Sequence, residues 1–117
     1  MPKILVIDDE IDICEMFREF FSKRGYEVIY ALTGRGGMDG FIVERPHIVT
    51  LDLCLNDING LEILKAIKDI DPSCIVIIIT GSASEDDKRK ALALGANYYI
   101  AKPFSIARLN SLIAEVA

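Results

Sequence analysis

The sequence predicts an α/β fold: a doubly wound, five-stranded parallel sheet in strand order 2-1-3-4-5, with five helices covering both of its faces. Short apolar runs alternate five times with longer segments whose apolar residues share one helical face, and this alternation is typical of right-handed crossover units. The runs are almost continuously apolar, as expected of strands buried on both faces. At 117 residues the chain is long enough for one domain, which we expect to span residues 1–117.

The predicted strands are runs rich in β-branched and aromatic residues. They lie at residues 4–7, 26–31, 47–51, 75–79 and 97–101. The longest apolar run covers residues 74–79 and is far too short to span a bilayer. We therefore expect no membrane segment.

The predicted helices are marked by a single apolar stripe and by signals at their ends. They lie at residues 10–24, in a glycine-rich segment that ends before Pro46, and at residues 61–70, 84–94 and 106–116. Gly25 and Gly95 stand where a helix C-cap favours glycine. Ser84 and Asp87 have the spacing of a capping box, which places the start of the fourth helix.

Two of these helices are expected to be weak. The second contains Gly34, Gly36, Gly37 and Gly40. Because a glycine inside a helix costs up to about 1 kcal/mol relative to alanine, we expect this helix to be short or to start late. The fourth helix has few apolar anchors, chiefly Ala91, Leu92 and Leu94.

Charge and cysteine content narrow the range of functions. A net charge of −5 argues against nucleic-acid binding, because such binding depends on lysine and arginine at the phosphate backbone. The three cysteines are an odd number without a C-x-x-C pair, which indicates reduced, cytosolic usage rather than disulfides or a zinc site. The apolar stretch at residues 4–7 is followed at once by acids, unlike a signal peptide. We expect a cytoplasmic domain that binds neither nucleic acid nor a membrane.

Polar residues gather at the carboxyl ends of the predicted strands, where ligands bind in open α/β sheets. These residues are Asp8, Asp9 and Glu10 after the first strand, Asp52 after the third, Thr80 at the end of the fourth and Lys102 after the fifth. Carboxylates packed together repel, so they either hold a proton or bind a cation. Magnesium prefers such oxygen ligands.

Each of these residues also has an ordinary structural explanation. Asp8 or Asp9 is suited to cap the first helix, and Asp52 to occupy a turn. Thr80 taken alone is a strand terminus, and Lys102 taken alone is a solvated charge. These explanations do not account for the joint occurrence of such residues at the matching ends of four strands.

Five motifs follow one another along the chain: Ile7-Asp8-Asp9-Glu10, Leu51-Asp52-Leu53 with Gly60, Ile79-Thr80-Gly81, Gly95-Ala96 before Tyr99, and Lys102-Pro103-Phe104. This ordered set closely resembles bacterial two-component receiver domains, of the chemotaxis-regulator type with a flavodoxin-like fold. The resemblance covers the whole chain. It implies a phosphorylation-dependent signalling switch that catalyses only its own phosphorylation and dephosphorylation.

The resemblance implies a magnesium site and a phosphoacceptor. Asp52 matches the phosphoacceptor, which also binds the metal, and Asp9 matches a direct magnesium ligand. Asp8 matches a residue that holds the ion through water, and the backbone carbonyl of Cys54 matches the third protein ligand.

The resemblance also assigns the groups that respond to the phosphoryl group. Lys102 and Thr80 each match a residue that binds a phosphoryl oxygen, and Tyr99 matches the aromatic that changes its packing on activation. The affected surface in the family is the face of helix 4, strand 5 and helix 5. A cis peptide bond between Lys102 and Pro103 is also implied.

The expected phosphoryl donor is a sensor histidine kinase or a phosphotransfer protein, and the output domain or target is unknown. The sequence does not decide whether phosphorylation causes the domain to form a homodimer.

One alternative function is that of an aspartate-nucleophile phosphatase, but such enzymes carry a second Asp where this chain has Cys54. A flavin carrier is disfavoured because Asp8 and Asp9 would repel the cofactor phosphate. The remaining alternative is a degenerate receiver that acts as an interaction module without phosphorylation.

Overall fold

Five strands alternate with five helices along the residues that the structure, a computed structural model, describes: 2–82 and 84–117. The strands are β1 (Lys3–Ile7), β2 (Glu27–Ala31), β3 (Ile48–Leu51), β4 (Ile75–Thr80) and β5 (Tyr98–Ala101). The helices are α1 (Ile11–Ser22), α2 (Gly34–Glu44), α3 (Gly60–Ile70), α4 (Glu85–Ala93) and α5 (Ile106–Val116). Each predicted element is present within a few residues of its expected bounds.

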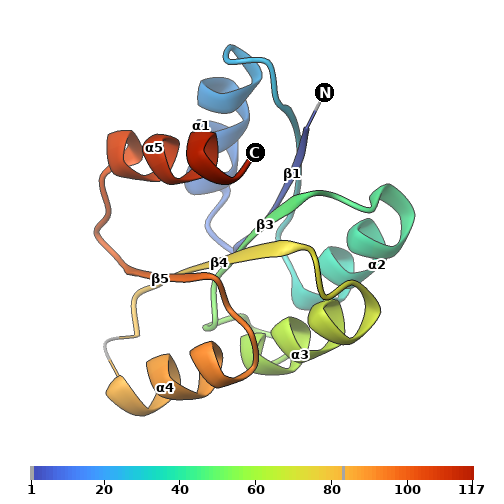
Figure 1. Cartoon of the computed structure of the whole chain (residues 1–117), viewed down its shortest axis with the longest axis vertical. Coiled ribbons are helices and arrows are strands. Elements are labelled where there is room, and N and C mark those ends of the chain that lie inside the picture. Colours follow the sequence, from blue (N-terminus) through green and yellow to red (C-terminus); the bar gives the residue numbers. More distant parts are fainter. Residues whose placement is uncertain (1, 83) are drawn as a thin grey trace.

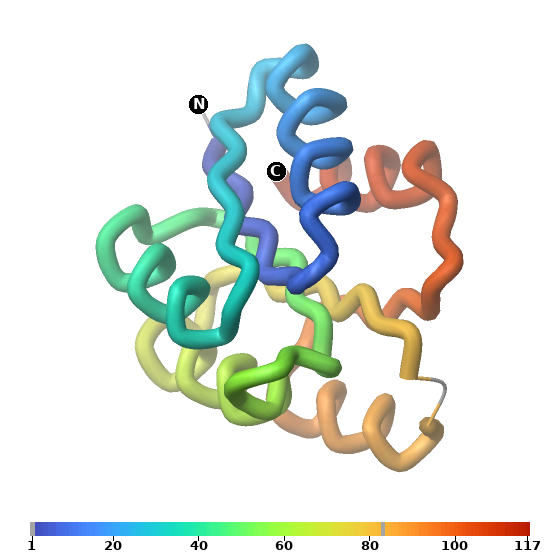
Figure 2. The backbone as a smooth tube through the Cα atoms, turned by 180° about the vertical axis from the view of Figure 1, so that it is seen from behind, coloured from blue at the N-terminus to red at the C-terminus, as the bar shows by residue number. Residues whose placement is uncertain are grey.

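The strands form one parallel sheet in the order β2-β1-β3-β4-β5. Helices α1 and α5 cover one face, and α2, α3 and α4 cover the other (Figure 1). The view from behind shows the same two layers (Figure 2). The predicted fold class and strand order are confirmed. Within the described ranges, no helix combines the length and apolar character needed to cross a membrane.

A separate hydrophobic core fills each face of the sheet. On the α1 and α5 face, Phe17 and Phe21 pack edge to face with ring centroids 5.9 Å apart, beside Leu109. On the opposite face, Phe41 of α2 and Ile67 of α3 are fully buried against the strands. Burying each such side chain contributes about 1.5–3 kcal/mol. The two cores together hold the strand ends in a fixed relation.

Helix α2 corrects the expectation drawn from its glycines. It is neither short nor late: it begins at Gly34 and runs for 11 residues, with Thr33 as its N-cap. A Cβ at Gly37 would lie 2.6 Å from Cδ1 of Ile7, and one at Gly34 would lie 2.6 Å from Cδ1 of Ile63. These glycines face the core and let α2 approach β1 and α3 closely, so packing outweighs their low helix propensity.

The predicted helix-end signals are present. Gly25 and Gly95 have φ values of +89° and +104°, the left-handed region that a glycine after a helix supplies. Ser84 caps α4, because its Oγ accepts a hydrogen bond from the amide of Asp87 at 3.2 Å. The Asp87 carboxylate accepts a hydrogen bond from Ser82 Oγ at 3.1 Å.

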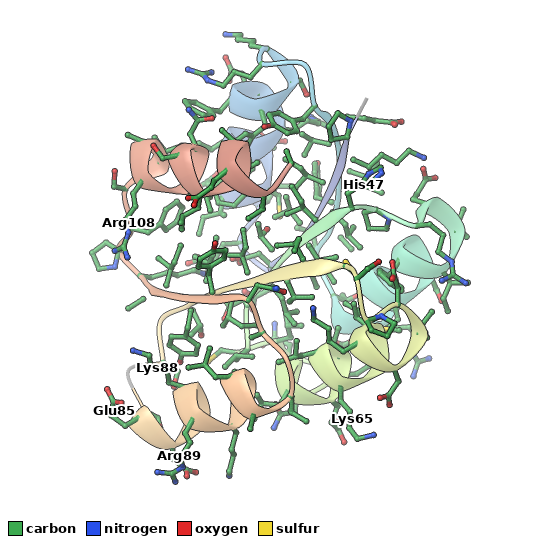
Figure 3. The ribbon with its side chains drawn as sticks, viewed as in Figure 1. His47, Lys65, Glu85, Lys88, Arg89 and Arg108 are labelled. Atoms are coloured by element: carbon green, nitrogen blue, oxygen red, sulfur yellow. The ribbon has the colours of Figure 1, made fainter. Side chains whose placement is uncertain are left out.

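Helix α4 has a small buried face. Among its described residues only Ala91 is buried. Leu92, expected as an anchor, is 46% exposed, so that expectation is wrong, whereas Leu94 does pack against the core. The side chains of Glu85 and Arg89 extend from the outer side of the helix (Figure 3). Helix α4 is therefore held more by its ends and by Ala91 than by an apolar stripe.

The three free cysteines are expected to differ in reactivity. Cys14 and Cys74 are buried and Cys54 is exposed. Burial raises the pKa of the Cys14 and Cys74 thiols to about 12, so both stay protonated near neutral pH, where the thiolate is the reactive species. A chromogenic disulfide reagent should label one thiol rapidly in the native protein and three after unfolding. Cys54→Ser should abolish the rapid phase, and rapid labelling of a second native thiol would contradict this assignment.

Candidate functional site

Strand register brings the polar strand-end residues to one rim of the sheet. Ile7 pairs with Leu51, so the next residues, Asp8 and Asp52, lie side by side, and the Asp52 amide donates to the Ile7 carbonyl at 3.0 Å. Across the sheet, the Lys102 amide donates to the carbonyl of Thr80 at 2.8 Å. The rim lies where the strand order reverses, the usual ligand position in this architecture.

The Asp52 carboxylate is buried and fixed by three donors. It is 5% exposed. Its Oδ1 accepts hydrogen bonds from the amide of Cys54 and the hydroxyl of Thr80, both at 2.9 Å. Its Oδ2 accepts one from Lys102 Nζ at 2.8 Å. A carboxylate held in this way has a single orientation toward the rim.

Lys102 places one positive charge among three carboxylates. Its Nζ donates to Asp8 Oδ2 at 2.9 Å, to Glu10 Oε2 at 2.9 Å and to Asp52 Oδ2 at 2.8 Å. Burial alone would lower the pKa of Lys102, but the hydrogen bonds to Asp52, Glu10 and Asp8 outweigh it and raise that pKa. The ammonium therefore stays charged at physiological pH. The Lys102–Pro103 peptide bond is cis, as expected from the sequence.

Asp8 is the most buried acid of the site, at 3% exposed. Its Oδ1 accepts a hydrogen bond from the Glu10 amide at 2.9 Å, which ties it to the start of α1. Burial raises the pKa of Asp8, and the nearby charge of Asp52 adds to the effect, whereas the Glu10 amide and Lys102 oppose it. Removing Asp8 from water is costly, and a further cation beside it would offset that cost.

The acids at the rim fit a small, hard divalent cation. One carboxylate oxygen from each of Asp8, Asp9 and Asp52 can be chosen so that all three lie within 4.8 Å of one another. Oxygens on opposite sides of a magnesium ion lie about 4 Å apart, since each bond is about 2.1 Å. The cluster is close to that size, and its donors are all carboxylate oxygens, the ligands that magnesium prefers.

Thr80 and Tyr99 are connected through Ser82. Thr80 is fully buried, and its Oγ accepts a hydrogen bond from the Ser82 amide at 3.3 Å while its hydroxyl donates to Asp52. The Tyr99 hydroxyl donates to the backbone carbonyl of Ser82 at 3.1 Å, and its ring is half-buried. Burial raises the pKa of the Tyr99 phenol. A change at the Thr80 hydroxyl thus has a short path to Tyr99.

Two residues of the site region escaped sequence reasoning. Glu10 stands within the acidic run without a predicted role, and the structure makes it a partner of Lys102. Asp57 has no predicted role either, and its carboxylate accepts hydrogen bonds from the first two amides of α2. Acidic residues in exposed loops are common, so no sequence signal distinguished Asp57. The run Asp8-Asp9-Glu10 did contain the signal for Glu10.

Comparisons with known proteins agree with this geometry. The sequence model of the family described as "Response regulator receiver domain" matches residues 4–114. The chain is 37% identical over 113 residues to sporulation initiation phosphotransferase F of Bacillus subtilis (strain 168), covering 97% of this chain and 91% of that protein. It is 32% identical to response regulator SaeR of Staphylococcus epidermidis, covering 100% of this chain but 52% of that protein. The chain therefore spans about half the length of this second relative.

Solved structures show the same likeness. A response regulator receiver domain protein (CheY-like) from Methanospirillum hungatei JF-1 superposes with a TM-score of 0.95 at 30% identity, over 98% of this chain and 92% of that one. A response regulator protein from Burkholderia pseudomallei, solved with a phosphorylated aspartic acid, a calcium ion and citrate, superposes with a TM-score of 0.88 at 27% identity. That match covers 100% of this chain and 67% of the other. The chain belongs to the response regulator receiver domain family.

Proposed function

We propose that this receiver domain accepts a phosphoryl group on Asp52, with Mg²⁺ bound beside it, from a histidine kinase or phosphotransfer protein of a two-component phosphorelay. The observation that carries the proposal is the buried Asp52 carboxylate, fixed by Cys54, Thr80 and Lys102 at a rim that also holds Asp8. The likeness to a phosphotransferase and to a regulator with a phosphorylated aspartic acid supports it.

The chemistry proposed for Asp52 is nucleophilic attack on phosphorus. A carboxylate oxygen forms a bond to the phosphorus while the bond to the donor's imidazole nitrogen breaks, and that nitrogen keeps the electron pair. Phosphoryl transfer depends on positioning and on neutralising oxygen charge. The hydrogen bonds from Cys54 and Thr80 position the carboxylate, and the Lys102 ammonium lies beside it, where it neutralises an incoming phosphoryl oxygen.

The proposed metal ligands are Asp9, Asp52 and the backbone carbonyl of Cys54, with Asp8 holding the ion through water. The grouping of the three aspartates supports this assignment. Bound magnesium would supply positive charge that neutralises the phosphoryl oxygens. Without a cation, Asp8, Glu10 and Asp52 share the ammonium of Lys102, and Asp9 adds a further carboxylate to the group.

We propose that the phosphorylated state is transmitted through Thr80. The acyl phosphate has strong acceptor oxygens and more charge than the carboxylate it replaces. The Thr80 hydroxyl would move from Asp52 toward a phosphoryl oxygen, which changes its bond with the Ser82 amide and the position of the Ser82 carbonyl that holds Tyr99. The expected output surface is the face of α4, β5 and α5, where α4 has a single buried residue.

The alternative is a degenerate receiver that acts as an interaction module without phosphorylation. It is not favoured, because Asp8, Asp52, Thr80 and Lys102 are joined by hydrogen bonds at one rim.

We further propose that residues 1–117 form one receiver domain that binds neither nucleic acid nor a membrane directly. The three free cysteines suit a reducing compartment such as the cytoplasm. A phosphorylation-dependent homodimer is left unassigned.

Intact mass spectrometry tests the proposal directly. The protein is incubated with acetyl phosphate, with and without magnesium, beside Asp52→Asn as the matched control. One added phosphoryl group that requires magnesium and is lost in Asp52→Asn is the expected result. No adduct, together with no binding of the phosphoryl mimic beryllofluoride, would reject the phosphoacceptor and favour the interaction module.

A further inference from the structure

The loop between β3 and α3 carries the proposed metal ligand Cys54 and is tied down at both ends. Near its start, the amide of Cys54 donates to Asp52 Oδ1 at 2.9 Å. At its end, the amide of Gly60 donates to the Leu53 carbonyl at 3.1 Å, and Asn59 caps α3 by accepting from the amide of Leu61 at 2.9 Å. All of these bonds lie within the loop and the elements it joins.

Asp57, in the middle of this loop, binds a different element. Its Oδ1 accepts a hydrogen bond from the Gly34 amide at 2.8 Å, and its Oδ2 accepts one from the Arg35 amide at 3.0 Å. These are the first two amides of α2, which have no partner inside the helix. The two backbone hydrogen bonds lower the pKa of Asp57, so the carboxylate is charged at neutral pH.

The contact between Asp57 and α2 depends on the close approach of the two elements. A Cβ at Gly34 would lie 3.1 Å from Oδ1 of Asp57 and 3.2 Å from Cβ of Ile58. Thr33, the N-cap of α2, accepts a hydrogen bond from the amide of Gly36 in the same first turn at 3.0 Å, which leaves the amides of Gly34 and Arg35 to Asp57. The helix start is therefore completed by a side chain 23 residues away in sequence.

We propose that Asp57 is a positioning residue for the metal site: it clamps the loop to α2 and so presets the loop that carries Cys54. The clamp is bidentate and charge-assisted, which fixes orientation as well as distance. Asp57 lies three residues beyond Cys54, so its release would free the middle of the loop between the ties at Cys54 and Asn59.

The clamp also makes the start of α2 sensitive to the metal. If Asp57 assists metal binding by holding the loop, then metal binding must stabilise the clamp by the same factor, because coupling between two sites is reciprocal. The amides of Gly34 and Arg35 report the clamp, since both donate to Asp57. Bound magnesium should therefore slow their hydrogen exchange.

The inference rests on the proposed magnesium site and is tested by titrating magnesium into variants of the 117-residue chain by calorimetry. Asp57→Ala should weaken magnesium binding by about 10-fold, the lower end of the effect of groups that orient metal ligands. Asp57→Asn keeps one acceptor oxygen and should fall between. The matched control is Asp71→Ala, because Asp71 accepts two hydrogen bonds from Ser73 at the far end of α3. It should bind magnesium like the wild type.

Amide exchange measured by NMR supplies the second readout. Magnesium should slow exchange at Gly34 and Arg35 in the wild type and leave it unchanged in Asp57→Ala. Wild-type protein that binds no magnesium would reject the metal site of the proposed function and the clamp's role with it. Wild-type binding with unchanged affinity in both Asp57 variants would overturn the clamp alone, and the proposed function would stand.

Discussion

Replacing Lys102 with methionine is expected to lower the free energy of unfolding by about 2–4 kcal/mol when no divalent cation is present. Removing one partner of a buried ion pair costs about 3–5 kcal/mol, because the remaining charge has lost its counter-charge. The Lys102 side chain is 17% exposed, and the Asp8 and Asp52 side chains are each 5% exposed. Proton uptake by Asp8, whose pKa is already raised by burial, limits the loss to the lower range.

The same variant should respond strongly to magnesium. The ion would replace the missing positive charge beside Asp8 and Asp52, so saturating magnesium should shrink the stability deficit. The rate of phosphorylation by acetyl phosphate should still fall by about 10²- to 10³-fold, the usual effect of removing one donor that stabilises developing oxygen charge. Urea unfolding with chelator or with magnesium, and phosphorylation followed by intact mass, measure the two effects.

Lys65→Met is the matched control for Lys102→Met. Lys65 pairs with Asp69 at 3.0 Å, but both side chains are about two-thirds exposed, at 64% and 66%. Its side chain extends outward from α3 (Figure 3). Such pairs contribute about 0.3–0.5 kcal/mol, so stability and phosphorylation should be close to those of the wild type. Equal losses in the two lysine variants would show that the site geometry does not govern the effect.

Substituting Gly60 with alanine is the second change with a large expected effect. A Cβ at this position would lie 2.5 Å from Cα of Leu53 and 2.7 Å from the backbone oxygen of Asp52. Both are backbone atoms, so no side-chain rotation relieves the overlap. We expect a loss of about 3 kcal/mol in the free energy of unfolding. The backbone shift also displaces Asp52, so phosphorylation should fall as well.

Gly40→Ala separates packing from helix propensity. Gly40 lies in α2, and a Cβ there would meet only Cδ1 of Leu5, at 3.6 Å, an ordinary contact. Alanine should therefore stabilise the protein by about 0.5–1 kcal/mol. Urea denaturation of Gly40→Ala and Gly60→Ala measures the expected gain in stability of the first and the expected loss in the second. A Gly60→Ala variant with wild-type stability and normal phosphorylation would contradict the predicted clash, because the loop after Asp52 would then accommodate the Cβ.

The sheet and its polar rim could be predicted from the sequence because both depend on periodicity. Apolar runs and helical stripes set the order of elements, and the parallel register then places Asp8 beside Asp52 and Lys102 beside Thr80. The end of α1 could also be predicted, because Gly25 adopts the left-handed backbone conformation that glycine favours after a helix. Such local patterns are reliable when a particular backbone conformation favours a particular residue type.

The predictions that failed depend on two tertiary features: contacts between residues distant in sequence, and which side of a helix faces solvent. The glycines of α2 have the low helix propensity that predicts a short helix. At Gly34 and Gly37, however, the side chains of Ile63 and Ile7 leave no room for a Cβ, so these positions require glycine. Leu92 looked like an anchor by composition, although the helix turns it to solvent. Asp57 completes the start of a helix that precedes it by more than 20 residues. Helix propensity describes a residue by itself and does not include its tertiary neighbours, and in each of these cases tertiary packing determines the outcome.

The position of Lys102 in the chain has a consequence during protein synthesis. It follows β5, the last of the described strands in chain order, which lies at one edge of the sheet and pairs with β4. A nascent chain on the ribosome therefore exposes Asp8, Asp9 and Asp52 well before their cation emerges. Until β5 docks, the acids stay hydrated and mutually repelling, and the Asp52 carboxylate lacks one of its three donors. The fold thus makes assembly of the charged rim depend on completion of the sheet, because Asp8 and Asp52 gain the ammonium of Lys102 only when β5 is in place.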